Sequence, residues 1–269
     1  MPNQEAKITK SVTENAYDDV RNKQNWAMQC LYGSAFLLGL CVIYSNLPDR
    51  WQIIDKGVFL SINMLQVVAL LGYHGFALWA SIIHYEAGKI HYPDLIDNAF
   101  GTVLTSDHSE NYYASEAVKE GAGKLAWNVT ENCYFTYTIY KMMRWKVLEK
   151  SVLIILFFAV ALIFDHNDWI ITFFRLTIPI VWIKKTVVFL YALNEFRIQY
   201  DRAFFVMTHP SSSNKQLLAD SVNILLHYES LKAWLNIPTD SKIHKSQNAY
   251  LNSEFEIISQ NFKIKKETT

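Results

Sequence analysis

Twenty consecutive residues, Trp26 to Ser45, carry no charged side chain. As a helix rising about 1.5 Å per residue, this stretch is long enough to cross the roughly 30 Å hydrocarbon core of a bilayer. A second uncharged stretch, Gly57 to Ile83, is longer than a span requires and is expected to tilt or to project from the bilayer. With the short connector 46–56, the two stretches predict a transmembrane hairpin over residues 26–83. The largely polar arm 1–25 lacks the features of a removable signal peptide, so we expect the first span to be retained.

A second apolar block predicts another hairpin, over residues 147–193. The stretch 147–164 is apolar, residues 165–168 form a polar turn, and the stretch 169–193 is apolar with three basic interruptions. Trp145 and Trp169 bracket the third span as interfacial anchors do, and the turn contains no Lys or Arg, which favours a membrane location. Because the third span is short, a buried helical hairpin of a soluble domain is the alternative.

The composition excludes several other classes of protein. Hydrophobic residues make up 51% and aromatic residues 14% of the 269 residues, which is too apolar for a typical soluble enzyme. The 25 basic and 25 acidic residues cancel, so no global field would draw the chain to a nucleic acid polymer. Three cysteines cannot form a disulfide framework, and we expect all three to be reduced thiols.

Basic residues predict the orientation, because Lys and Arg are retained on the cytoplasmic side of a membrane. They occur in the arm 1–25 and in the segments 84–146 and 194–269, whereas the two connectors hold only Arg50 and Lys56. Both termini and the central segment are therefore expected in the cytoplasm. The sequence predicts an all-α membrane protein, with four transmembrane helices in two hairpins and a helical cytoplasmic domain.

The two cytoplasmic segments, 84–146 and 194–269, are together large enough to bury a core of their own. The pattern predicts a short helix after Pro93, and a helix that is robust from near Lys124 and can run straight into the third span. The apolar face of the latter is predicted to hold Leu125, Val129, Cys133 and Thr136 with Tyr137. A third helix is expected over 217–235, with an apolar stripe of Leu218, Val222, Leu225, Leu226 and Trp234, and residues 239–269 read as a weak helix with a frayed basic end.

We find no sequence motif for catalysis. The chain contains no nucleophile elbow, no phosphate-binding glycine loop and no paired zinc-ligand motif. His84 and His91 with Asp94 and Asp97 come nearest to a metal set, but their spacing does not fix a coordination geometry, and polar residues at the surface or at the edge of the core explain them better. We therefore expect no catalytic residue, metal ion or cofactor.

Polar residues inside the predicted spans are more informative, because such residues usually face a partner or water. Asn63, Gln66 and His74 lie in the second span, where they suit either hydrogen bonds between helices or the lining of a pore. Arg175, Lys184 and Lys185 lie in the fourth span, on either side of Pro179, which is expected to bend the helix. Snorkelling toward the bilayer surface and the lining of an aqueous path explain these three cations equally well.

The middle of the chain also carries a family resemblance. It reads Tyr92-Pro93-Asp94-Leu95-Ile96-Asp97-Asn98-Ala99-Phe100-Gly101, then Tyr112-Tyr113, Trp127-Asn128, Glu131-Asn132 and Phe135, between two pairs of predicted spans. In this layout it resembles the four-transmembrane effector proteins of bacterial anti-phage signalling, which are encoded beside nucleotidyltransferase-like or polymerase-like enzymes in CBASS and related systems. The resemblance implies a pore-forming effector in the bacterial inner membrane, gated by a cyclic (oligo)nucleotide that the cytoplasmic domain senses.

Such a ligand presents phosphates and flat bases, so its site requires cations, amides and aromatic faces. The residues that could supply them are Tyr112, Tyr113, Asn98, Asn111, Asn128, Asn132, Lys124 and Arg202. A packed aromatic core with solvated charges is the competing account, and for any single residue it is favoured over a role in binding. A symmetric ligand suits a groove shared by two subunits, so a homo-oligomer, at least a dimer, is expected. A membrane-anchored scaffold or adaptor without a pore is the alternative function, and an intramembrane enzyme has the least support.

Overall fold

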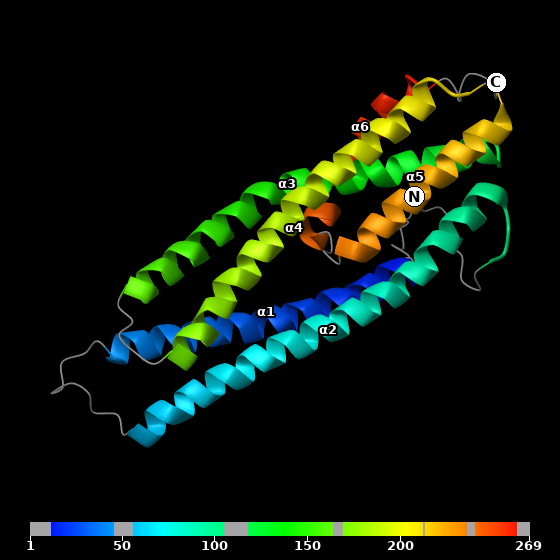
Figure 1. Ribbon diagram of the computed structural model, residues 1–269. Helices are drawn as coiled ribbons and strands as arrows, with labels where there is room; N and C mark the ends of the chain where they lie inside the picture. Colours follow the sequence, from blue (N-terminus) through cyan, green and yellow to red (C-terminus); the bar gives the residue numbers. More distant parts are fainter. Residues whose placement is uncertain are drawn as a thin grey trace, which may run out of the picture. The chain divides into compact units, whose positions relative to one another are not determined.

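The computed structural model describes residues 12–45, 56–104, 118–163, 169–211, 213–235 and 240–262 (Figure 1). In these ranges the backbone forms helices and no strand, which confirms the predicted all-helical class. The helices are α1 (Val12–Ser45), α2 (Lys56–Phe100), α3 (Ala122–Ile163), α4 (Trp169–Thr208), α5 (Asn214–Leu235) and α6 (Ser241–Ser259). Tyr112, Tyr113 and Asn111 lie outside the described residues, and so does the predicted turn at 165–168.

The chain divides into two compact units. We call the first the hairpin unit; it comprises Val20–Ile82 and Met143–Tyr191. We call the second the aromatic unit; it comprises Met1–Asp19, Ile83–Met142 and Ala192–Thr269. Helices α1 to α4 each contribute residues to both units, whereas α5 and α6 belong to the aromatic unit alone.

The interior of the hairpin unit is built by parts of four helices. Its buried residues are Ala27, Leu31 and Leu38 of α1, Leu70 and Tyr73 of α2, Phe158 of α3, and Ile178 and Trp182 of α4. A Cβ atom added at Gly72 would lie 3.3 Å from Cys30 Sγ, so a glycine lets α1 and α2 approach closely there. The hydroxyl groups of Ser151 and Thr186, 2.6 Å apart, join α3 to α4.

Large apolar side chains also cover the outside of the hairpin unit. Phe36 is 67% exposed, Leu71 65% and Leu78 65%, and more than a dozen other large apolar residues of this unit are exposed as well. Within the described residues, two helices are long and apolar enough to cross a membrane: α1 over Tyr17–Tyr44 and α2 over Gly57–Phe100. Only 28% and 22% of their most apolar stretches are buried.

Aromatic rings from three helices form the core of the aromatic unit. Trp127 of α3 contacts Phe255 of α6 edge-on, with ring centroids 5.7 Å apart, and Phe262 at 5.3 Å. Tyr134 of α3 contacts Tyr200 of α4 at 5.5 Å. Of the predicted face of α3, Leu125, Val129 and Cys133 are buried, and Thr136 and Tyr137 are half-buried. Helix α3 also runs without a break from Ala122 to Ile163, as the pattern allowed.

Helix α6 confirms the helix predicted near the end of the chain, and the predicted frayed end lies outside the described residues. It is continuous from Ser241 to Ser259, and the Asp240 carboxylate caps its first turn by accepting hydrogen bonds from the backbone N–H groups of Lys242 and Ile243. Ile243, Leu251 and Phe255 are buried on one face. The sparse apolar residues are thus spaced to dock one side of a short helix, which stabilises it beyond its own helix propensity.

Helix α2 corrects the expected helix start near Pro93. The helix is unbroken from Lys56 to Phe100, with Pro93 inside it. Proline in a helix interior costs about 3 kcal/mol, because a hydrogen bond is lost and the ring crowds the preceding turn. His91, Asp94 and Leu95 on either side are buried. Packing of these neighbours offsets the cost of the proline.

Candidate functional site

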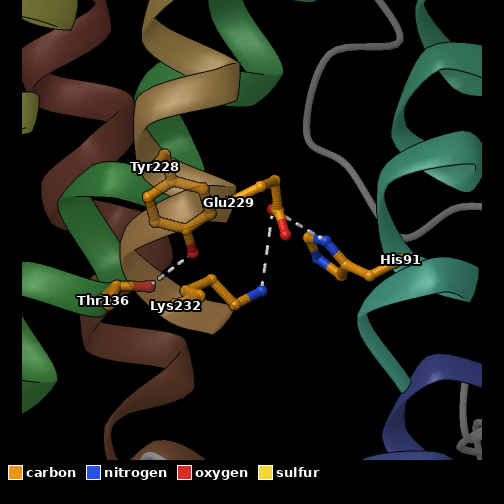
Figure 2. A network of polar contacts seen from close by, with 5 residues as sticks. All are labelled: His91, Thr136, Tyr228, Glu229 and Lys232. Carbon is orange, nitrogen blue, oxygen red and sulfur yellow. Dashed lines mark hydrogen bonds and ion pairs between the residues drawn. The ribbon is translucent and has the colours of Figure 1, made fainter. Parts of the chain in front are cut away.

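Charged side chains meet inside the aromatic unit, in the network drawn in Figure 2. Glu229 and Lys232 lie one turn apart on α5, with 3.7 Å between Oε1 and Nζ, and their side chains are only 16% and 17% exposed. His91 of α2 approaches the same carboxylate, with 3.1 Å between Nδ1 and Oε1. One carboxylate on α5 therefore lies between a lysine of its own helix and a histidine of α2.

Aromatic side chains complete the surroundings of Lys232. Its Nζ atom lies 5.3 Å from the ring centre of Tyr17 on α1 and 5.2 Å from that of Tyr228 on α5, distances at which a ring face attracts a cation. The hydroxyl of Tyr228 forms a 2.8 Å hydrogen bond with that of Thr136 on α3 (Figure 2). The network thus joins residues of α1, α2, α3 and α5.

The ion pair stays charged across the physiological pH range. Burial alone would raise the pKa of the Glu229 carboxyl, but the Lys232 ammonium and His91 outweigh burial and lower this pKa to about 2. Burial alone would lower the pKa of Lys232, but the Glu229 carboxylate, together with Tyr228 and Tyr17, outweighs it and holds this pKa well above its ordinary value. Both groups therefore stabilise the folded state as ions rather than serving as a proton donor or acceptor near pH 7.

The network therefore holds together the helices that carry its residues. Burial raises the pKa of the neighbouring Cys133 thiol, which keeps it protonated and unreactive.

Across the described residues, no group of three or more His, Cys, Asp or Glu side chains could hold a metal ion. Of the four residues nearest to a metal set in the sequence, His91 approaches Glu229, and Asp97 accepts hydrogen bonds from Thr102 Oγ1 and the Leu104 backbone at the end of α2.

Two predicted ligand-binding residues form a pair elsewhere in the same unit. Asn128 of α3, which is fully buried, donates from Nδ2 to Asn98 Oδ1 of α2 over 2.8 Å. Among the described residues, no hydrogen-bond partner reaches Oδ1 of Asn128 or Nδ2 of Asn132, one turn further along α3. Two polar atoms are thus left available at this place, where a water molecule or a ligand could satisfy them.

The other predicted ligand-binding residues do not join this pair. Lys124 is half-buried in the first turn of α3, and Arg202 is exposed on α4. In the described ranges, neither makes a hydrogen bond or an ion pair with Asn98 or Asn128. The structure therefore pairs two of the eight predicted residues and places Asn132 one turn from Asn128. It leaves Lys124 and Arg202 apart from them and does not describe the remaining three.

The polar residues of the predicted spans lie in different surroundings. Asn63 donates a hydrogen bond to the Phe59 carbonyl of its own helix, Gln66 is buried, and His74 is exposed. The Gln66 backbone carbonyl accepts a hydrogen bond from Ser34 Oγ of α1 at 3.4 Å. Lys184 is exposed and Lys185 is half-buried, while the side chain of Arg175 lies outside the described part. These residues do not form one continuous polar row.

Sequence reasoning missed the Glu229–Lys232 pair, although a signal for it exists. The buried face of α5 consists of Leu217, Ser221, Ile224, Leu225, Tyr228 and Leu235. Glu229 and Lys232 lie at the edge of this face, one turn apart, where a solvated charge is not expected. Two opposite charges beside an apolar face point to an internal ion pair. The sequence does not reveal that His91 and Tyr17, more than a hundred residues away, complete it.

Comparisons with protein-family models, with curated proteins and with solved structures find no match to this chain. A function must therefore be inferred from the chain's own residues and surfaces.

Proposed function

We propose that the protein is a membrane effector of bacterial anti-phage defence. In this proposal, the hairpin unit is embedded in the inner membrane as a multi-pass assembly with both termini in the cytoplasm. The aromatic unit senses a cyclic (oligo)nucleotide, and the assembly then permeabilises the membrane. The ligand and the defence role rest on the resemblance of residues 92–135 to four-transmembrane effectors, and the membrane location rests on the surface described next.

The observation that carries the proposal is the apolar exterior of the hairpin unit. The core helix of a soluble protein hides its apolar residues, whereas only 28% and 22% of the apolar stretches of α1 and α2 are buried. Monomeric soluble proteins rarely expose a continuous apolar surface of this kind. A lipid bilayer is the environment in which such an apolar surface is stable. About 20 residues of α1, from Trp26 onward, are long enough to match the thickness of a bilayer.

The Asn98–Asn128 pair is the best site for the proposed ligand among the described residues. Asparagine amides match the edges of nucleobases, and Asn128 Oδ1 and Asn132 Nδ2 are an acceptor and a donor not used within the described structure. Asn128 is fully buried, so the ligand would enter only when α2 and α3 separate locally. Ligand binding would then be coupled to a movement of helices, as gating requires.

We also propose that the protein acts as a homo-oligomer that associates through the outer face of α5. Leu218, Val222, Leu226 and Trp234 are exposed there at four- and eight-residue intervals, with Ala219, Asn223, His227, Ser230 and Ala233 beside them. None of these residues is Asp, Glu, Lys or Arg. Leu226 is the midpoint of the row, so a two-fold axis beside Leu226 would bring this face of two copies together as an antiparallel pair.

Liposomes that contain the purified full-length protein and a self-quenching dye test the gating. We expect one member of a panel of cyclic di- and trinucleotides to release the dye, and Asn128→Ala to reduce the release at a given nucleotide concentration. Asn252→Ala, at an exposed position of α6, is the matched control and should respond as the wild type does. Calorimetry on the same samples separates binding from release.

The outcomes discriminate between the proposed functions. Binding without dye release would favour the membrane-anchored scaffold. If folded protein in vesicles neither binds nor responds to any nucleotide in the panel, the sensor function is wrong. Expression in bacteria with and without the neighbouring genes, while growth and membrane potential are followed, tests the defence role.

A further inference from the structure

Lys185 occupies unusual surroundings in the hairpin unit. Its Nζ atom lies 3.2 Å from the Met28 thioether sulfur of α1. It also lies 5.0 Å from the ring centre of Tyr73 on α2 and 5.9 Å from that of Trp182 on α4. The side chain is half-buried, and three helices surround its charged end.

Among the described residues, no carboxylate forms an ion pair with Lys185. A thioether is a weak acceptor, and ring faces recover only part of the hydration that an ammonium loses on burial. An anion from outside the chain would neutralise a half-buried cation of this kind. The two rings and the sulfur would orient the ammonium group without neutralising it.

Neighbouring residues indicate what that anion is. Lys23 Nζ lies 4.1 Å from the ring centre of Trp26 and 4.3 Å from that of Trp79, and Lys184, beside Lys185, is exposed. Tryptophan, tyrosine and lysine together are typical of the level at which lipid headgroups meet the hydrocarbon core. Basic pockets between helices on the cytoplasmic side are known to bind anionic headgroups.

We propose that Lys185, with Tyr73, Trp182 and Met28 around it, is a binding site for the phosphate of an anionic phospholipid headgroup. This inference rests on the proposed membrane location of the hairpin unit, but not on the nucleotide or on the pore. The ammonium group donates hydrogen bonds to the phosphate oxygens, and the rings contact the glycerol region. The site selects an anionic lipid over a zwitterionic one, because only the anionic lipid supplies net charge to neutralise the lysine.

Native mass spectrometry of the full-length protein in detergent, titrated with phosphatidylglycerol or with phosphatidylcholine, tests the site. We expect the wild type to retain phosphatidylglycerol preferentially. Lys185→Met should weaken that retention by about fivefold to tenfold, the effect of one basic residue on an anionic headgroup. Lys184→Met is the matched control and should retain the lipid as the wild type does, and Lys185→Arg, which keeps the charge, should also retain it.

Equal phosphatidylglycerol retention by Lys185→Met and Lys184→Met would overturn the inference. So would displacement of the lipid by inorganic phosphate at the same concentration, since the site would then serve free phosphate. Should Lys185→Met fail to fold, loss of lipid preference in Lys185→Arg would count against a site that depends on charge. A protein that does not enter vesicles of either lipid contradicts the proposed membrane location itself. One that enters both without preference contradicts only the lipid site.

Discussion

Glu229 makes the clearest electrostatic contribution of any single residue in the aromatic unit. Its carboxylate lies between Lys232 and His91, and its depressed pKa means that the folded state favours the ionised form. A carboxyl group with a depressed pKa stabilises the fold at pH values above its unfolded pKa, and this contribution is lost as the pH falls toward the folded pKa. The relevant window runs from about pH 4.5 down to about pH 2.

We predict that Glu229→Gln lowers the free energy of unfolding at pH 7 by about 3 kcal/mol, because Lys232 keeps its charge and loses its partner. The variant should also lack the loss of stability that the wild type shows between about pH 4.5 and pH 2, since no carboxyl titrates at this position. Denaturant unfolding of the detergent-solubilised protein, followed by tyrosine and tryptophan fluorescence over this pH range, measures both effects.

Glu256→Gln, at an exposed position of α6, is the matched control and should change the stability by less than about 0.5 kcal/mol. Parallel pH profiles for the wild type and Glu229→Gln would show that the carboxylate is not held in its charged form by the fold.

At the scale of the element, the helices show what the sequence predicts and what it leaves open. On α3 the predicted residues Leu125, Val129 and Cys133 are buried, but residues between them, such as Trp127 and Asn128, are buried too, so the buried surface is wider than the predicted row. Helix α5 was expected to bury Leu218, Val222, Leu226 and Trp234, but these are exposed, and of the predicted stripe only Leu225 is buried. Two apolar rows lie side by side on α5, and periodicity alone does not choose between them.

The choice on α5 is made by contacts that the sequence pattern does not contain. Tyr228 forms a hydrogen bond with Thr136 of α3, and Glu229 lies beside His91 of α2. The side of α5 that carries Tyr228 and Glu229 therefore faces the interior of the unit. For the same reason, the sequence predicts Asn98 and Asn128 only as two of the eight candidate ligand-binding residues. It does not predict that these two form a pair. Residue types and helical spacing predict which side chains are candidates, and tertiary packing decides which of them meet.

We predict that Leu226→Asp on α5 prevents self-association and leaves the fold intact. Leu226 is 61% exposed, so the substitution buries no charge in the monomer, whereas in an antiparallel pair it would set two carboxylates against each other. Mass photometry of the detergent-solubilised protein should show a shift from dimers or larger assemblies to monomers. Ile257→Asp, at a comparably exposed position of α6, should not dissociate the assembly, and an unchanged mass distribution for Leu226→Asp would place the interface elsewhere.

At the scale of the whole molecule, four helices contribute residues to both the hairpin unit and the aromatic unit. Helices α1 and α2 meet the length and composition of membrane spans, and the proposed four-span topology adds α3 and α4 to them.

We predict that reporter fusions at Ser109 and at Thr269 are cytoplasmic, and that a fusion between Asp165 and Asp168 is external. The reason is the concentration of Lys and Arg in the arm 1–25 and in the segments 84–146 and 194–269. Paired alkaline phosphatase and green fluorescent protein fusions in bacteria measure the location of each site. An external Ser109 would contradict the topology, and a cytoplasmic 165–168 would mean that the second hairpin does not span.

The connection between α2 and α3 is closed at its base. The Gly121 backbone N–H donates to the Ala99 carbonyl over 2.9 Å, and Gly101 adopts a φ of 64°, which favours glycine, as the chain leaves α2. The two ends of the intervening segment are therefore fastened to each other, and its length places little demand on the helices that it joins. The segment between α2 and α3 could therefore be exchanged at this base, in evolution or by design. The same helices would then carry a segment of different specificity.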